Sequence, residues 1–215
     1  MKRLTKASLR SAINMLLFSI VGTTILVFTF NLTHELIAQS ENTAKLKLIN
    51  QIVPATLYDN DLLKDSTALP PSDQLGTEQS TVAYRGRLDG QPSIVVIEVI
   101  APDGYSGKIN MIVAIDYAGS ISGVRVVSHR ETPGLGDYID IAKKAWINLF
   151  GGASHQRYQE AEWQVKKDGG QIDYMAGATI TPRAVIKAVH KALHYFEENR
   201  DKLFEQNSGK EALKS

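Results

Sequence analysis

The loop 177–183, with the sequence GATITPR, holds the residues best suited to chemistry. Gly177 and Ala178 are small enough to let a ligand approach the backbone, and Thr179 offers a hydroxyl just before a predicted helix. The N-terminus of a helix carries unpaired N–H groups and a partial positive charge, so it favours a phosphate group. The structural alternative is that Thr181 caps the helix and the small residues only turn the chain. On these residues alone, the structural alternative is the simpler one.

A second loop, 131–137 with the sequence ETPGLGD, combines residues that bend the chain with residues that could line a pocket. Its proline and two glycines fix a tight bend, whereas Glu131, Thr132 and Leu135 could face a ligand. The GxG spacing within it is not a dinucleotide-binding fingerprint, because position 139 is isoleucine rather than glycine. The loop could also be a simple link between a strand and a helix.

Two further loops are rich in polar residues and glycine. The segment 166–170 (KKDGG) has the composition of a solvated turn, although Lys166 could instead face a phosphate. The segment 103–107 (DGYSG) has the composition of a connection between two hairpins. Neither segment predicts a site by itself.

The familiar templates for catalysis and metal binding are not found. His190 and His194 have the i, i+4 spacing of metal ligands, but no glutamate follows His190 as in a zinc-protease motif, so solvated positions on a helix are expected. A G-x-S-x-G elbow and a phosphate-binding P-loop are absent. The lack of cysteine excludes disulfides, cysteine-ligated iron–sulfur clusters and a cysteinyl flavin. We therefore expect neither catalytic residues nor a metal site.

The charge distribution argues against nucleic-acid binding. The chain has a net charge of +1, yet its first acidic residue is Glu35, and four basic residues come before it: Lys2, Arg3, Lys6 and Arg10. Without those four charges the rest of the chain has a net charge of −3. A mildly acidic body of otherwise globular composition is unsuited to binding a phosphate backbone.

The segment 11–32 predicts a membrane-spanning helix. It carries no charged residue, and as a helix it would be roughly 33 Å long, enough to cross a bilayer. The basic residues before it keep the N-terminus in the cytoplasm, which places the rest of the chain outside.

Two alternatives exist for this segment. A cleaved signal peptide has an apolar region of only about 7–15 residues, and the nearest small-x-small pair, at 38–40, lies beyond His34 and Glu35. A buried core helix would not need the basic flank. We therefore expect an uncleaved anchor.

The rest of the chain predicts an α+β fold, in which one antiparallel sheet is packed with helices. Four strands rich in valine and isoleucine are expected at 81–87, 93–101, 108–116 and 121–128. Helices are expected at 34–53, at 138–150 and from Thr181 onward, with another strand at 162–167. The predicted divisions are a cytoplasmic basic tail (1–10), the membrane helix (11–32), a membrane-proximal helix and surface excursion (33–80), the main domain (81–198) and a polar tail (199–215).

Three blocks of sequence carry a resemblance to a known family. They are 101–107 (APDGYSG), 131–137 and 177–185, and they follow the N-terminal anchor in that order. Together they resemble the G subunit of the Rnf ion-translocating electron-transport complex. They are also similar, more distantly, to the C subunit of the Na⁺-translocating NADH:quinone oxidoreductase. The resemblance runs from the anchor to Tyr195.

The resemblance implies an extracytoplasmic FMN-binding domain with the cofactor attached covalently. In that family the FMN phosphate is esterified to the threonine after Gly-Ala, which corresponds to Thr179, and a dedicated flavin transferase makes the link. Family members usually have serine or threonine where this chain has Ala176, so a hydroxyl is lost while the acceptor stays. With the chemistry of the loops, the resemblance makes Glu131, Thr132, Leu135 and Gly136 candidates for the flavin pocket.

The implied function is that of a redox subunit without catalytic residues of its own. It would relay electrons in the bacterial inner membrane, with its main domain periplasmic, between the other subunits of an Rnf-like complex that links ferredoxin and NAD. Two alternatives stay open: a membrane-anchored module that binds a ligand reversibly in the same loops, and an assembly subunit without a covalent cofactor.

Overall fold

The computed structural model describes residues 2–205. They fall into two compact units, which divide between Leu46 and Lys47. The first unit is the larger part of one long helix, α1 (Lys2–Ile52), as expected from the apolar segment and the helical pattern after it. Within α1, the stretch Leu9–His34 has a mean hydropathy of 2.0 and is long and apolar enough to cross a membrane. None of it is buried against protein, so an apolar solvent is needed to stabilise it.

Three threonine hydroxyls in this stretch are paired within the helix. Thr24, Thr29 and Thr33 donate to backbone carbonyls four residues earlier, at 2.8, 2.8 and 2.9 Å. A hydroxyl without a partner is costly in the hydrocarbon layer, so this local bonding makes the threonines compatible with a membrane span.

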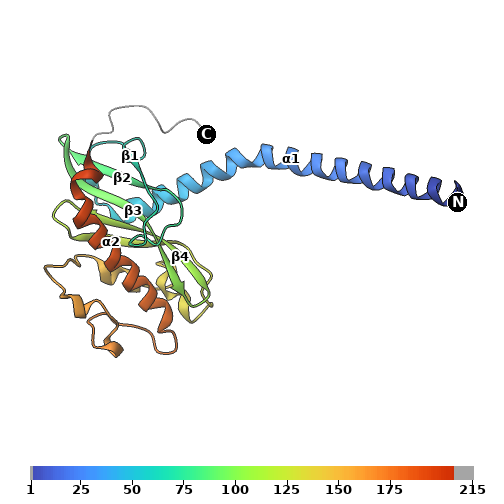
Figure 1. The fold of residues 1–215 in the computed structure, drawn as a ribbon. Coiled ribbons are helices and arrows are strands. Elements are labelled where there is room, and N and C mark those ends of the chain that lie inside the picture. Colours follow the sequence, from blue (N-terminus) through green and yellow to red (C-terminus); the bar gives the residue numbers. More distant parts are fainter. Residues whose placement is uncertain (1, 206–215) are drawn as a thin grey trace. The chain divides into compact units, whose positions relative to one another are not determined.

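The second unit is built on a five-stranded antiparallel sheet whose strands are neighbours in chain order (Figure 1). The strands are β1 (Ser66–Leu69), β2 (Thr81–Leu88), β3 (Gln91–Gly104), β4 (Gly107–Asp116) and β5 (Ile121–Ser128). The four strands expected from the sequence are confirmed as β2 to β5. The sequence did not predict the short edge strand β1, because it lies inside a polar region whose composition is typical of irregular structure.

Both faces of the sheet are buried, which explains its nearly continuous apolar strands. On β4, Ile109, Met111 and Val113 face one core, whereas Ile112 and Ala114 face the other, as the two-residue period of a strand requires. The helix α2 (Ile180–Phe204) covers the first face (Figure 1). The end of α1 covers the second face. Its Ile52 packs directly against Gly123, so closely that a Cβ on this glycine would lie 2.7 Å from the isoleucine side chain.

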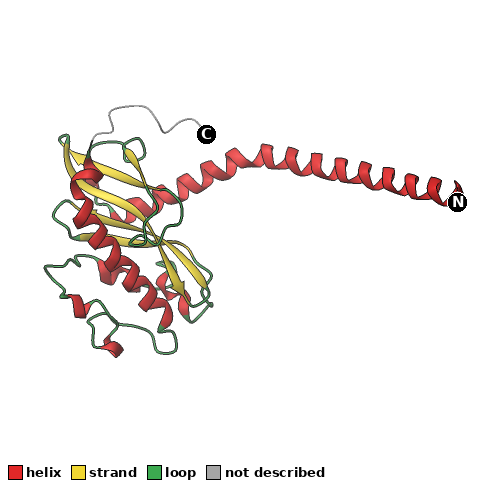
Figure 2. Ribbon diagram, viewed as in Figure 1, coloured by secondary structure: helices red, strands yellow, loops and turns green. Residues whose placement is uncertain are grey.

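The region between β5 and α2 contains short 3-10 turns separated by loops (Figure 2). The prediction of a helix at 138–150 is wrong, because only Gly136–Ile139 and Ala145–Phe150 are helical and both are 3-10 turns. Asp140 is extended, and its carboxylate accepts the N–H of Ala142 at 2.9 Å, a local bond that competes with helix formation. The strand expected at 162–167 is also wrong: it is reduced to one bridge between Val165 and Ile172.

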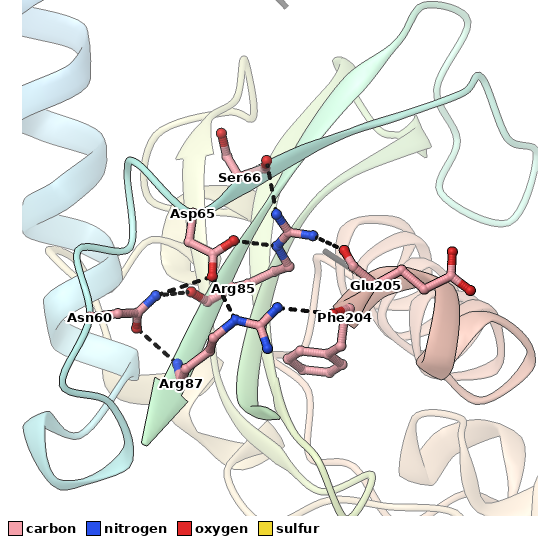
Figure 3. Close-up of polar contacts among 7 residues, drawn as sticks. All are labelled: Asn60, Asp65, Ser66, Arg85, Arg87, Phe204 and Glu205. Atoms are coloured by element: carbon pink, nitrogen blue, oxygen red, sulfur yellow. Dashed lines mark hydrogen bonds and ion pairs between the residues drawn. The ribbon is translucent and has the colours of Figure 1, made fainter. Parts of the chain in front are cut away.

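The C-terminal end of α2 is held to the sheet by two arginines of β2 (Figure 3). Arg87 Nη2 donates to the carbonyl of Phe204 at 2.9 Å, and Arg85 Nη1 donates to the carbonyl of Glu205. These bonds satisfy carbonyls that a helix end leaves without partners. The polar tail expected from residue 199 therefore begins later than predicted, because α2 continues to Phe204 and buries Leu203.

One carboxylate fixes both arginines. Asp65 Oδ1 lies 2.6 Å from Arg85 Nε, and its Oδ2 lies 2.8 Å from Arg87 Nε (Figure 3). The Arg85 side chain is only 6% exposed, so its charge depends on this partner.

We predict that Asp65→Ala lowers the free energy of unfolding by about 2–3 kcal/mol, because it leaves two largely buried guanidinium groups without their anion. Guanidinium denaturation of the detergent-solubilised chain, followed by tryptophan fluorescence, measures the change. The control Lys64→Ala breaks an ion pair whose lysine side chain is 86% exposed, and it should have little effect. Equal effects of the two variants would contradict the role given to Asp65.

Candidate functional site

A cavity of about 300 Å³ lies where three loops of the second unit meet. The loops are the β3–β4 turn, the segment after β5 and the segment that leads into α2. The cavity brings together eight of the residues that the sequence singled out: Glu131, Thr132, Leu135, Gly136, Gly177, Ala178, Thr179 and Thr181. Tyr105 and Ile180 also line it, and the sequence reasoning missed both.

Glu131 is the residue that joins the three loops. Its side chain is buried, with 4% of the residue exposed. Oε1 accepts the backbone N–H of Ser106 at 3.0 Å, and Oε2 accepts the hydroxyl of Thr181. A buried carboxylate is tolerated only with such partners, so each bond both satisfies the charge and fixes a loop.

The glycines around this carboxylate leave room for its bonds. A Cβ on Gly136 would lie 2.6 Å from Glu131 Oε2 and 2.8 Å from the Thr181 hydroxyl. A Cβ on Gly104 would lie 2.9 Å from Glu131 Oε1. The close approach of the loops therefore requires residues without a side chain at both positions.

Thr179, rather than Thr181, is the N-cap residue of α2. The expectation that Thr181 caps the helix is wrong, because its hydroxyl is bound to Glu131 inside the first turn. The Thr179 carbonyl accepts the N–H of Arg183 at 3.3 Å, while its side chain makes no capping hydrogen bond with any described residue. Thr179 thus lines the cavity at the helix N-terminus, and its hydroxyl is not used to cap the helix in the described part of the chain.

Tyr138 supports the segment that precedes Thr179. It is almost fully buried, and its hydroxyl accepts the N–H of Met175 at 3.3 Å and donates to the carbonyl of Ala178 at 3.4 Å. Burial raises the pKa of the Tyr138 phenol, so it stays protonated and able to donate near neutral pH. Nothing in the local sequence pattern distinguished this tyrosine from an ordinary core residue.

Two cationic residues near the segment that leads into α2 are already paired. Lys166 is not among the residues that line the cavity, and its Nζ lies 2.6 Å from Asp173 Oδ1. Arg183 makes two bonds to Asp168, at 2.6 and 2.7 Å. The cavity itself is therefore lined by apolar groups, hydroxyls, backbone and one carboxylate.

Large apolar side chains are exposed around the cavity. Tyr105 is 66% exposed, Leu135 49% and Ile180 47%. Exposed apolar groups around a concave site are typical of binding surfaces. A flat, largely apolar ligand would cover them while the cavity holds its polar end.

Two family models match this chain. The FMN-binding domain matches residues 104–194, which include every residue that lines the cavity, and the RnfG N-terminal region matches residues 1–52.

Curated relatives match nearly the whole chain. The G subunit of the ion-translocating oxidoreductase complex of Aliivibrio fischeri is 43% identical over 90% of this chain and 92% of its own length. The same subunit of Pseudomonas aeruginosa is 43% identical over 92% of both chains. That of Vibrio cholerae is 44% identical over 88% of this chain and 90% of its own.

Among solved structures, the C subunit of the Na⁺-translocating NADH-quinone reductase of Parabacteroides distasonis is similar. It has 19% sequence identity and a TM-score of 0.45, and the match covers 79% of this chain and 96% of that chain.

We predict that Glu131→Ala lowers the free energy of unfolding by about 2–4 kcal/mol, because it leaves the Ser106 N–H and the Thr181 hydroxyl buried without their acceptor. Glu131→Gln keeps an acceptor oxygen of the same shape, and the threonine hydroxyl can rotate to accept from the amide, so its cost should be about 1 kcal/mol or less. Thermal unfolding followed by tryptophan fluorescence distinguishes the two. If glutamine were as damaging as alanine, the bridging role of the carboxylate would be refuted.

Proposed function

The chain belongs to the RnfG family, the G subunits of ion-translocating oxidoreductase complexes, and we propose that it is the membrane-anchored electron-transfer subunit that carries FMN covalently on Thr179. Such a subunit relays electrons between other subunits of an Rnf-like, ferredoxin- and NAD-linked complex. The flavin supplies the electron chemistry, and the protein positions it and sets its surroundings. The observation that carries the proposal is the Thr179 hydroxyl, which caps no described N–H group and lies beside a cavity within the FMN-binding domain.

The surroundings of Thr179 suit a phosphoester. Because Thr179 is the N-cap residue, a phosphate on its hydroxyl would lie at the positive end of α2, where an anion is stabilised by about 0.3–1 kcal/mol. The ester bond would form between the threonine Oγ and the FMN phosphorus of an activated donor, a flavin dinucleotide. The P–O bond of its pyrophosphate would break, a nucleoside monophosphate would leave, and the hydroxyl proton would pass to solvent. A flavin transferase is the catalyst we propose, since the one carboxylate that lines the site, Glu131, already accepts two hydrogen bonds.

The remaining residues of the cavity have supporting roles in this proposal. Tyr105, Leu135 and Ile180 would contact the isoalloxazine ring, because they present exposed apolar surface beside the attachment point. Glu131 and Tyr138 act as positioning residues, because they hold the loops on either side. Lys166 stays a proposed phosphate contact, and it would have to exchange its pairing with Asp173 to make one.

We also propose that the N-terminus is cytoplasmic and the second unit periplasmic in the inner membrane. The basic cluster before residue 11 favours this orientation. The ester would then keep the cofactor on the protein in a compartment where free flavin is lost by dilution.

We predict that the chain co-expressed with a flavin transferase fluoresces as a flavoprotein in a denaturing gel, and that Thr179→Val abolishes this signal because it removes the hydroxyl proposed to form the ester. Thr179→Ser keeps a hydroxyl and should retain part of the signal. Intact mass of each protein reports the attachment directly.

Thr181→Ser serves as the matched control, since it keeps the bond to Glu131 and should leave the attachment unchanged. A wild-type chain without covalent flavin, matured in this way, would reject covalent attachment. Flavin recovered only in native, non-denatured protein would instead support a reversible binding module, and no flavin in either state would support an assembly subunit.

The orientation of the chain in the membrane can be tested separately from flavin attachment. Because the chain has no cysteine, single-cysteine variants report the side of the membrane without background. In spheroplasts, a membrane-impermeant maleimide should label Ser80→Cys directly and Ser8→Cys only after lysis. The opposite labelling would contradict a periplasmic domain, whatever the state of the flavin.

A further inference from the structure

Three histidines gather at a place that shares no residue with the cavity. His155 lies in the loop after the 3-10 turn Ala145–Phe150, whereas His190 and His194 lie one turn apart on α2. One potential ligand atom from each lies within 4.8 Å of the other two. The expectation that His190 and His194 occupy solvated positions is wrong for His190, whose side chain is 12% exposed, whereas that of His194 is 39% exposed.

His155 is oriented with one ring nitrogen free. Its Nδ1 lies 2.8 Å from Glu197 Oε2, so Nδ1 carries the proton that this bond requires. Its Nε2 is buried and has no hydrogen-bond partner among the described residues. A carboxylate that holds one nitrogen of a histidine while the other is left with its lone pair is the arrangement found behind metal-binding histidines.

The ring of His190 is also held in place, in this case by stacking, and one of its nitrogens is likewise unpartnered. Its ring stacks on Trp163, with the centroids 4.8 Å apart and the planes 8° from parallel. Its Nε2 is buried without a well-aligned hydrogen bond in the described part of the chain. The unprotonated nitrogen of a neutral imidazole is a common metal ligand.

The carboxylate of Glu160 lies beside two of these histidines. Glu160 Oε2 lies 3.3 Å from His190 Nε2 and 3.4 Å from His194 Nε2. The plainer interpretation is an ion pair between Glu160 and protonated histidines. That interpretation leaves the buried Nε2 of His155 without a partner among the described residues.

We propose that the Nε2 atoms of His155, His190 and His194, with the carboxylate of Glu160, bind one Zn²⁺ ion. Three imidazoles and one carboxylate form a typical tetrahedral zinc ligand set, with Zn–N distances of about 2.0–2.1 Å. A tetrahedron of that size places the nitrogens about 3.4 Å apart, so the cluster contracts on binding. Because all four positions come from protein, the site is structural.

The ion would tie the loop region before α2 to the middle of that helix. This region consists of short 3-10 turns, which alone provide little stabilisation. Residues 155 and 160 would be fixed to α2, whose first turn borders the cavity. The zinc site and the flavin attachment are independent proposals, since they share no residue.

The test is zinc binding to the tag-free, full-length chain in detergent, stripped with chelator and titrated with ZnCl₂ by calorimetry. We expect one ion per chain and a rise in the unfolding temperature of about 5–10 °C when free zinc is about 100 times the dissociation constant. Co²⁺ in place of zinc should give the visible absorption bands of a tetrahedral site.

The variants His155→Gln and His194→Gln should each weaken zinc binding by more than about 100-fold, and Glu197→Ala by about 10–100-fold through the loss of its hold on His155. His34→Gln, at the end of the membrane stretch, is the matched histidine control and should bind like the wild type. Far-UV circular dichroism checks that each variant is folded.

Absence of zinc binding to the wild type overturns the proposal, as does unchanged affinity in both His155→Gln and His194→Gln. A cobalt spectrum without tetrahedral bands also overturns it, and this measurement needs no variant to fold.

Discussion

The carboxylate of Glu131 is the point at which the three loops of the site are joined. It accepts one bond from the β3–β4 turn and one from the first turn of α2, and it belongs to the segment after β5. Because the group is buried, neither bond can be exchanged for water at little cost. The cavity beside Thr179 exists because these loops are held together, so the attachment site proposed for FMN depends on a residue that forms no covalent bond itself.

The rest of the fold makes that junction rigid. The sheet is buried on both faces, and the alternation along β4 sends Met111 to the core under α2 and Ile112 to the core under α1. The loops that carry Ser106, Glu131 and Thr181 therefore begin or end in elements with no freedom to shift. The apolar stretch Leu9–His34 of α1 makes no such contacts and is instead suited to the hydrocarbon layer of a membrane, as a single-pass anchor.

The strands were predictable because local signals agree: valine-rich runs are separated by tight turns such as Asp89-Gly90, where Asp89 has a φ of 52°. The strand β1 lacked such a run, and the helix expected at 138–150 failed because the Asp140 side chain competed for the backbone. The candidate site was found largely through family resemblance, since spacing alone favoured a simple cap at Thr181. The histidine cluster was missed because His155 meets His190 only through tertiary packing, which no sequence period reports.

The helix α2 is fixed at both ends, and this bears on electron transfer. Arg85 and Arg87 hold its last carbonyls, and Glu131 holds its first turn. Its 25 residues form a rod about 37 Å long, and any sliding or tilting in response to a change of charge at its N-terminus would break these bonds. A flavin attached there would gain and lose electrons inside surroundings that stay still, so the reorganisation energy of each transfer would come from the cofactor and nearby water rather than from the protein.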